Sequence, residues 1–281
     1  MYRRFRFLLI MSCLAVFAQA KAQFNDPKTL EVGPHVGVSY YMGDLNPMKP
    51  FAQSRLQYGG LVRFNYDNRW SFRFDFAHAT VTASDEVIKW RPERGLNFTT
   101  HINDFSVVAE FNFVEYYTGN PKKNVSPYIF GGFSVFQYTV FTQAGDNLVN
   151  LSNYQTEGPQ DPNAKWYEKM FGKTSPVGIS IPFGLGVKFS LSRQLAATVE
   201  WRMQKTFTDY LDDVAKLYPQ HHAFYTDEND NTYDLTDPTG NYLAGHQRGN
   251  SAFNDWFGMA RVSFTWKFNL PDGRGCNLSK F

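Results

Sequence analysis

The feature that most constrains this chain is an alternation of apolar and polar residues that recurs in eight segments. Successive side chains of a β-strand point to opposite faces, so apolar residues at every second position indicate strands with one apolar face. The segments do not follow the roughly 3.6-residue period of an amphipathic helix. The predicted strands span residues 31–41, 56–66, 70–82, 104–115, 127–141, 179–190, 195–206 and 256–268.

The third and fifth segments mark the extremes of this pattern. In 70–82, aromatic residues at every second position alternate with polar or charged ones, as in Trp70-Ser71-Phe72-Arg73. The segment 127–141 is apolar on both faces, which leaves its orientation open. Each segment has about the 9–11 residues that a tilted strand needs to cross a bilayer, or slightly more. Strands of this kind would fit a membrane barrel.

The connections between the segments add a second signal, because they differ in length. Long connections (42–55, 83–103, 142–178 and 207–255) are separated by the short turns 67–69 and 191–194 and by the intermediate stretch 116–126. Outer-membrane barrels have short periplasmic turns and long external loops, and an even strand number puts both termini in the periplasm. We therefore predict an all-β fold, an eight-stranded antiparallel transmembrane β-barrel with up-and-down meander topology. A soluble β-sandwich is the alternative, since it would bury the same apolar faces between two sheets.

Residues 1–22 have the features of a cleaved signal peptide. Three arginines precede the apolar run 7–17, and Ala20-Lys21-Ala22 fits a small-x-small cleavage site. The run is too short for a transmembrane anchor. We expect a signal peptide (1–22), an outer-membrane barrel with four long external loops (23–268) and a periplasmic tail (269–281).

The charge balance limits the possible partners. The chain has 28 Lys+Arg and 26 Asp+Glu, a formal net charge of +2, which excludes a polybasic nucleic-acid binder. Aromatic residues make up 17% of the chain and lie mainly on the apolar strand faces, so we expect outer-membrane lipid to be the partner of those faces.

If the apolar faces meet lipid, the opposite faces line the lumen and carry charges of both signs. An eight-stranded barrel is only just wide enough for side chains to fill, and buried charges are costly unless they pair. We therefore predict a packed salt-bridge network, with a charged conduction path as the alternative. The predicted members are Arg63, Arg73, Asp75, Glu110, Lys188, Glu200, Arg202 and Arg261, with Glu31 and Lys267 on the same faces.

The sequence contains no Gly-rich phosphate loop, no Gly-x-Ser-x-Gly and no His-Glu-x-x-His, so we expect neither a cofactor nor enzymatic activity. The last long connection combines carboxylates with imidazoles, which could hold a divalent cation. A solvated acidic loop is the favoured interpretation. The weak metal candidates are Asp209, Asp212, Asp213, His221 and His222.

Two further groups of residues have positions of interest. Near the predicted outer rim, where membrane-embedded hydrolases and acyltransferases hold their catalytic groups, lie His78, His101, Asp85 and Asp104, but no spacing among them specifies a site. On the predicted periplasmic side, the turn 116–126 and the tail offer contacts for a partner, through Lys122, Lys123 and Cys276. An ordinary frayed terminus is the alternative for the tail.

Four stretches together resemble the PorG-like outer-membrane barrels of the type IX secretion system. They are Tyr41-Met42-Gly43-Asp44-Leu45-Asn46, Ser126-Pro127-Tyr128-Ile129-Phe130-Gly131-Gly132, Ile181-Pro182-Phe183-Gly184-Leu185-Gly186-Val187-Lys188 and Lys205-Thr206-Phe207-Thr208-Asp209-Tyr210-Leu211-Asp212-Asp213-Val214. The resemblance runs from about Leu30 to Phe268. It implies a non-enzymatic component that anchors or assembles a periplasmic ring of lipoprotein and partner subunits. The alternative is a small OmpA- or OmpX-like barrel whose external loops bind a ligand or surface, or an outer-membrane hydrolase or acyltransferase.

Overall fold

The computed structural model describes residues 28–154, 156, 176–250 and 254–270. The predicted signal peptide, residues 271–281 of the predicted tail, and Cys276 lie outside the described residues.

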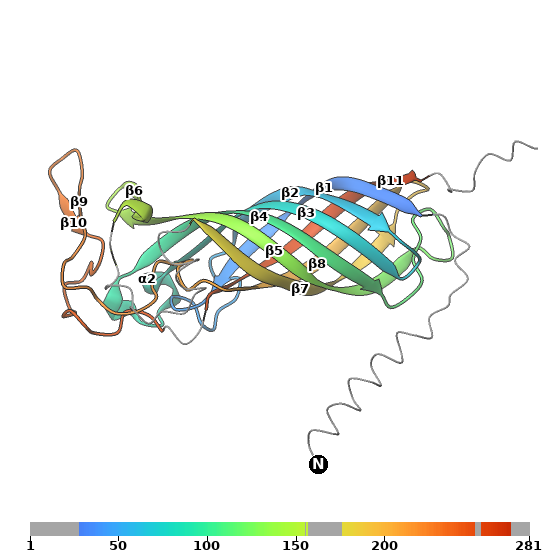
Figure 1. Ribbon diagram of the computed structural model, residues 1–281. Helices are drawn as coiled ribbons and strands as arrows, with labels where there is room; N and C mark the ends of the chain where they lie inside the picture. The colour runs from blue at the N-terminus through green and yellow to red at the C-terminus, as the bar shows by residue number, and fades with distance from the viewer. Residues whose placement is uncertain (1–27, 155, 157–175, 251–253, 271–281) are drawn as a thin grey trace, which may run out of the picture.

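Eight long strands in the described part of the chain close into an antiparallel barrel (Figure 1). Each strand pairs with its sequence neighbours among these eight, and the first pairs with the last, Thr29 opposite Asn269. This confirms the predicted eight-stranded up-and-down barrel and excludes the sandwich, because a closed sheet has no free edge. The strands are β1 (Thr29–Met42), β2 (Arg55–Asn65), β3 (Trp70–Ser84), β4 (Asn97–Asn112), β5 (Val125–Ala144), β7 (Val177–Ser190), β8 (Leu195–Thr206) and β11 (Trp256–Asn269).

The two ends of the barrel differ in character. One end, here called the short-turn end, carries both described chain ends and the turns 66–69, 113–124 and 191–194. The other, the long-loop end, carries the remaining connections. There β6 (Asn147–Asn150) turns back and pairs antiparallel with the end of β5, and a hairpin of β9 (Phe224–Thr226) and β10 (Thr232–Asp234) projects from the last loop (Figure 1).

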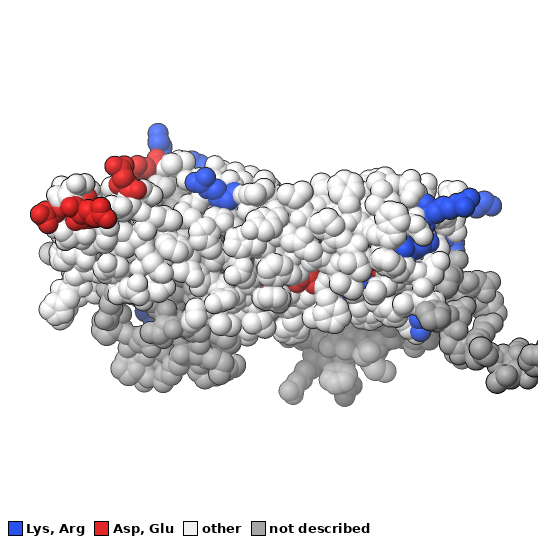
Figure 2. All heavy atoms as spheres, turned by 90° about the horizontal axis from the view of Figure 1, so that it is seen from above, with Lys and Arg blue, Asp and Glu red and all other residues white. Residues whose placement is uncertain are grey.

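The outer surface of the barrel carries an uncharged apolar belt. Phe74, Phe105 and Phe133 are 61%, 59% and 71% exposed, and their neighbours on every strand are similar. Figure 2 shows Lys, Arg, Asp and Glu side chains gathered toward the two ends, with almost none between them. So large an exposed apolar surface marks an interaction site, and on a barrel of this size it has the form of a lipid-facing band.

The alternation reverses at one level of the barrel on three adjacent strands. On β3, β4 and β5 the continuous row of outward apolar residues ends at Phe76, Phe105 and Val135, which are paired across the strands, and the next outward positions hold His78, Asn103 and Gln137. Farther along β5, Phe141 also faces outward. Beyond this level the inward residues are apolar and buried, among them Val81, Phe98, Ile102 and Tyr138. The reversal indicates that the outside of the barrel meets water there, while the inside is packed by loops.

This reversal explains where the predicted strand limits were wrong. The fourth strand begins at Asn97, whereas the prediction began it at residue 104. The prediction missed the first residues of this strand because their outward side chains are polar, and the outward side chains of a lipid-facing strand would be apolar. The connection predicted at 83–103 is therefore only 85–96, and it contains α2 (Asp85–Ile88) and η1 (Pro92–Arg94). The segment 127–141 is apolar on both faces because β5 crosses the level at which the apolar residues change from the outward face to the inward face.

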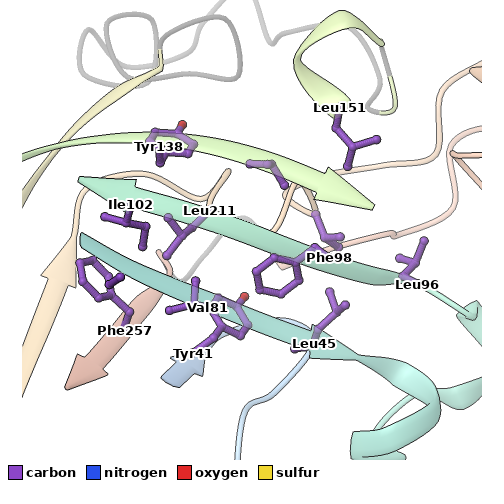
Figure 3. Close-up of a cluster of buried hydrophobic side chains, with 14 of the residues drawn as sticks. Tyr41, Leu45, Val81, Leu96, Phe98, Ile102, Tyr138, Leu151, Leu211 and Phe257 are labelled. Carbon is purple, nitrogen blue, oxygen red and sulfur yellow. The ribbon is translucent and has the colours of Figure 1, made fainter. Parts of the chain in front are cut away.

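The long-loop half of the lumen holds an apolar core (Figure 3). Inward residues of β3, β4 and β5 pack there with Leu45 and Leu211 from two different loops. Thr100 Oγ1 of β4 donates a hydrogen bond to the carbonyl of Leu211 at 2.6 Å, which anchors the last loop inside the mouth.

No helix in the described residues is long and apolar enough to cross a membrane.

Inward aromatic side chains of β5 fit because β7 has glycines opposite them. Phe130 faces Gly184 and Tyr128 faces Gly186 in the strand register. A Cβ atom on Gly184 would lie 2.7 Å from the Phe130 ring and 2.1 Å from the backbone oxygen of Trp201. Glycine is thus required at this position for the ring and the neighbouring strand to approach each other.

Candidate functional site

The short-turn half of the lumen is filled by a single network of buried ion pairs. It joins five carboxylates to five cationic side chains: Glu31, Asp75, Asp104, Glu110 and Glu200 with Arg63, Arg73, Lys188, Arg202 and Arg261. The structure thus brings together all eight residues singled out from the sequence with Glu31, which the sequence placed on the same faces, and adds Asp104. Lys267 instead donates a hydrogen bond to the carbonyl of Thr118 at 2.5 Å.

Glu110 is the centre of one half of this network. Its carboxylate lies 2.9 Å from Arg63 Nε, 3.1 Å from Arg73 Nε and 2.6 Å from Lys188 Nζ. Arg73 continues to Glu200, with Nη1 at 2.6 Å from Oε2. One carboxylate therefore satisfies three buried cations, and the loss of its charge would leave an excess of positive charge in the lumen.

Asp75 is the centre of the other half of the ion-pair network. Arg261 joins it to Glu200, with Nη2 at 2.7 Å from an oxygen of each carboxylate. Arg202 extends the network to Asp104 at 3.2 Å. Asp104 was assigned to the outer rim from the sequence, although its position next to the outward Phe105 already implied an inward side chain.

The mouth at the short-turn end is closed by the turn 113–124. Thr118 Oγ1 donates a hydrogen bond to Glu31 Oε1 at 2.6 Å, so the turn is attached directly to the ion-pair network. Tyr116 is 4% exposed and its ring lies 5.8 Å from Lys188 Nζ. The turn therefore packs into the barrel.

The mouth at the long-loop end is closed by a cap of three loops joined by Arg94. Its guanidinium binds Asp85 through two nitrogens, at 2.6 and 3.0 Å. It also donates to the carbonyls of Asp44 at 3.2 Å and Arg248 at 3.0 Å, which belong to the first and last loops. Because one buried side chain satisfies groups from three loops, the cap is a packed layer above the apolar core.

Beneath this cap, one tyrosine hydroxyl lies between two buried carboxyls. Tyr41 Oη is 2.5 Å from Asp212 Oδ2 and 2.6 Å from Asp255 Oδ1. A hydroxyl can donate only one hydrogen bond, so both short contacts form together only when one carboxyl is protonated and donates to the tyrosine. The three groups therefore share a proton between two acids.

Burial explains why these acids hold that proton. Burial, followed by the neighbouring Asp255 and Asp44 carboxylates, raises the pKa of Asp212 well above its usual range. Burial raises the pKa of Asp255 to about 7, although its hydrogen bonds to Tyr41 and to the Leu211 amide act in the opposite direction. Since Leu211 N–H donates to Asp255 Oδ2 at 3.0 Å, the protonation state of the pair is linked to the plugging loop.

The metal candidates do not form one site. Asp212 contacts Tyr41, Asp213 accepts a hydrogen bond from Thr156, and His222 Nδ1 is hydrogen-bonded to Asp234 Oδ2. Asp209 lies on the same loop and His221 is exposed. Among the described residues, no group of three or more His, Cys, Asp or Glu side chains is arranged to hold a metal ion.

The rim candidates are also dispersed. Asp85 is bound by Arg94, whereas Asp104 lies in the lumen beside Arg202 and Ser134. His78 and His101 lie together on the outer face of β3 and β4. On the short-turn side, Lys122 is exposed and Lys123 forms an ion pair with Glu115 at 3.3 Å.

A closed eight-stranded barrel with an apolar belt and an ion-paired lumen is the architecture of a small outer-membrane β-barrel. Residues 5–159 match the family described as a domain of unknown function, DUF6089, and the chain belongs to that family. No curated protein is similar enough in sequence to count as a relative.

Several solved outer-membrane barrels have similar folds at low sequence identity. OprG from Pseudomonas aeruginosa is 11% identical with a TM-score of 0.41, and the match covers 87% of this chain and 97% of that one. The N-terminal barrel domain of OprF from the same organism is 12% identical with a TM-score of 0.38, covering 85% and 97%. The attachment protein Ail of Yersinia pestis, in complex with a heparin analogue, is 10% identical with a TM-score of 0.37, covering 86% and 99%.

Breaking the ion-pair network at Glu110 should be costly. We expect Glu110→Gln to lower the free energy of unfolding by about 3–5 kcal/mol, because it leaves three buried cations short of a counter-charge. Adding Lys188→Met should recover part of that loss, with a coupling energy of about 1–3 kcal/mol. Urea unfolding in detergent micelles, followed by tryptophan fluorescence, measures the free energy of unfolding of the single and the double variant.

Thr198→Val, in the lumen outside the network, is the control and should change the free energy of unfolding by less than about 1 kcal/mol. Strict additivity of the two changes would contradict the network.

The shared proton predicts a pH dependence of the cap. The folded-state pKa of Asp255 lies above that of an unfolded aspartate, about 3.9. The folded cap therefore binds more protons than the open one between these values, and its stability falls as pH rises through about 7. We expect exchange of the Leu211 amide hydrogen, corrected for its intrinsic rate, to reveal opening about a hundredfold easier at pH 8 than at pH 5. Asp255→Asn should flatten this dependence, and Asp227→Asn in the exposed hairpin should leave it unchanged. A wild-type profile without slope would contradict the proton-sharing arrangement.

Proposed function

We propose that this protein is a non-enzymatic outer-membrane component that anchors or assembles a protein secretion apparatus, and that it does not act as a pore. The observation that carries the proposal is the closure of the barrel at both mouths by its own chain. Ion pairs occupy one half of the lumen and an apolar core occupies the other. A barrel filled in this way can act only through its ends and its lipid-facing surface.

The proposed orientation places the short-turn end in the periplasm and the long-loop end outside the cell. The support is the general arrangement of outer-membrane barrels, in which short turns are periplasmic and long loops external. In this orientation the polar outward residues beyond His78, Asn103 and Gln137 meet the external medium. The predicted tail would leave β11 on the periplasmic side.

The more specific proposal is a role in type IX secretion, with a periplasmic ring of lipoprotein and partner subunits as the binding partner. It is supported by the four sequence stretches that resemble PorG-like barrels and by the exposed groups on the turn 113–124. Val114 is 52% exposed and Lys122 is exposed on the same turn, so an apolar and a cationic group are both available to a partner.

A filled lumen predicts that the purified protein does not conduct ions. Reconstituted into planar bilayers, the folded protein should produce no discrete single-channel steps at any salt concentration, since the network leaves no continuous water path. Heat-dependent mobility on gels verifies that the reconstituted protein is folded. Reproducible unitary currents from folded protein would contradict the proposed scaffold function.

The assembly role predicts association with periplasmic subunits. Extraction of the outer membrane in mild detergent, followed by purification of this protein, should recover the ring subunits. Lys122→Glu combined with Lys123→Glu, or removal of residues 271–281, should reduce that recovery, because both changes alter the proposed periplasmic face. Lys49→Glu, on the opposite end of the barrel, is the matched control and should have no effect. If the unaltered protein recovers no ring subunits, the secretion role is wrong, and a small barrel with binding loops becomes the better description.

A further inference from the structure

Two histidines lie side by side on the outer face of the barrel, just beyond the apolar belt. His78 on β3 and His101 on β4 have ring centroids 6.1 Å apart, with the ring planes 18° from parallel. The register pairs His78 with Asn103 and Thr80 with His101, so the two histidines are diagonal neighbours on adjacent strands. The proposed function uses neither of them.

Each imidazole is held in place through its Nδ1 atom. His78 Nδ1 lies 2.8 Å from Asn103 Oδ1, and His101 Nδ1 lies 3.0 Å from Thr80 Oγ1. The amide oxygen of Asn103 can only accept, so in the neutral ring the His78 proton is on Nδ1 and Nε2 carries a lone pair. Neither Nε2 atom makes a hydrogen bond to any described residue. A ring that donates from one nitrogen and leaves the other unprotonated is prepared to ligate a metal.

Aromatic rings on both sides restrict the orientation of the pair. Tyr58 on β2 lies 5.2 Å from the His78 ring, and Phe141 on β5 lies 5.4 Å from the His101 ring. The four rings form a diagonal row across four strands, in which His78 lies two residues beyond Phe76 and His101 lies four residues from Phe105. Both histidines are partly exposed, so an ion can reach them from the medium.

We propose that His78 and His101 form a two-histidine site for a borderline transition-metal ion, Cu²⁺, Ni²⁺ or Zn²⁺, bound through the two Nε2 atoms and completed by water. Imidazole is a preferred ligand for all three ions. At a metal–nitrogen distance of about 2.0–2.1 Å, the ion lies roughly 3.2 Å from each ring centre, so two rings on one ion can be up to roughly 6.4 Å apart. The observed 6.1 Å lies within this limit.

The site has only two protein ligands, which predicts its properties. No third His, Cys, Asp or Glu among the described residues joins the pair. The affinity should therefore be lower than that of a four-ligand structural zinc site. It should follow the general order for divalent ions, with Cu²⁺ bound more tightly than Ni²⁺ or Zn²⁺, and it should fall in acid because the ligating imidazoles must be unprotonated.

The test is a Cu²⁺ titration of the full mature protein, purified without a histidine tag and followed by calorimetry in detergent. We expect one ion per chain at pH 7.5 and loss of that binding in His78→Gln and in His101→Gln. Asn103→Ala should raise Kd by about tenfold or more, since it removes the hydrogen bond that orients His78. Binding should be greatly weakened at pH 5.

Two control variants distinguish this pair from other histidines. His246→Gln and His222→Gln alter histidines in the last loop and should leave the stoichiometry and affinity unchanged. Heat-dependent mobility verifies that each variant is folded, and His78→Asn is available if the glutamine variant does not fold. The proposal is wrong if the unaltered protein shows no saturable binding, if both His78→Gln and His101→Gln bind as it does, or if binding is lost with His222 instead.

Discussion

The structure depends on the pairing of charges inside a barrel too narrow to hold bulk water. Each carboxylate of the network contacts a cationic side chain within 3.2 Å, from Glu31 with Arg63 at one end to Asp104 with Arg202 at the other. Isolated buried charges would be very costly, so their mutual satisfaction is a condition for the strands to close. The same pairs fill the lumen. Stability and closure therefore have one cause, and a mutation that opened a path would also remove counter-charges from their partners.

The level at which the alternation reverses divides the molecule into two physical environments. On one side of Phe76 and Phe105 the barrel has apolar side chains outside and ions inside, whereas on the other side it has polar side chains outside and an apolar core inside. The second part is built like a water-soluble domain, with loops in place of a second sheet. The proton shared by Asp212 and Asp255 lies in this part, where local opening can occur without disturbing the lipid-facing wall.

The strands and the lumen could be predicted because a period of two residues encodes both. Arg63, Arg73 and Glu200 could be assigned to the lumen from parity alone. The same rule missed residues 97–103 of β4, because it assumes one environment along the whole strand. Asp104 was placed at a rim from its position at the start of a predicted strand, although the same rule gives it inward parity beside Phe105. No local pattern indicated that Thr118 would bind Glu31, because the turn 113–124 folds back into the barrel.

By itself the sequence determined the number of strands, which side chains face the lumen and which meet the apolar surroundings, since these follow from local alternation and connection length. Only the tertiary structure decided which groups meet. Tyr41 is 171 residues from Asp212 and 214 from Asp255, yet one hydroxyl touches both. His78 and His101 become neighbours only through the register of β3 and β4. Such contacts depend on strand register and on the paths of long loops, which are set by packing of the whole chain and not by the residues on either side.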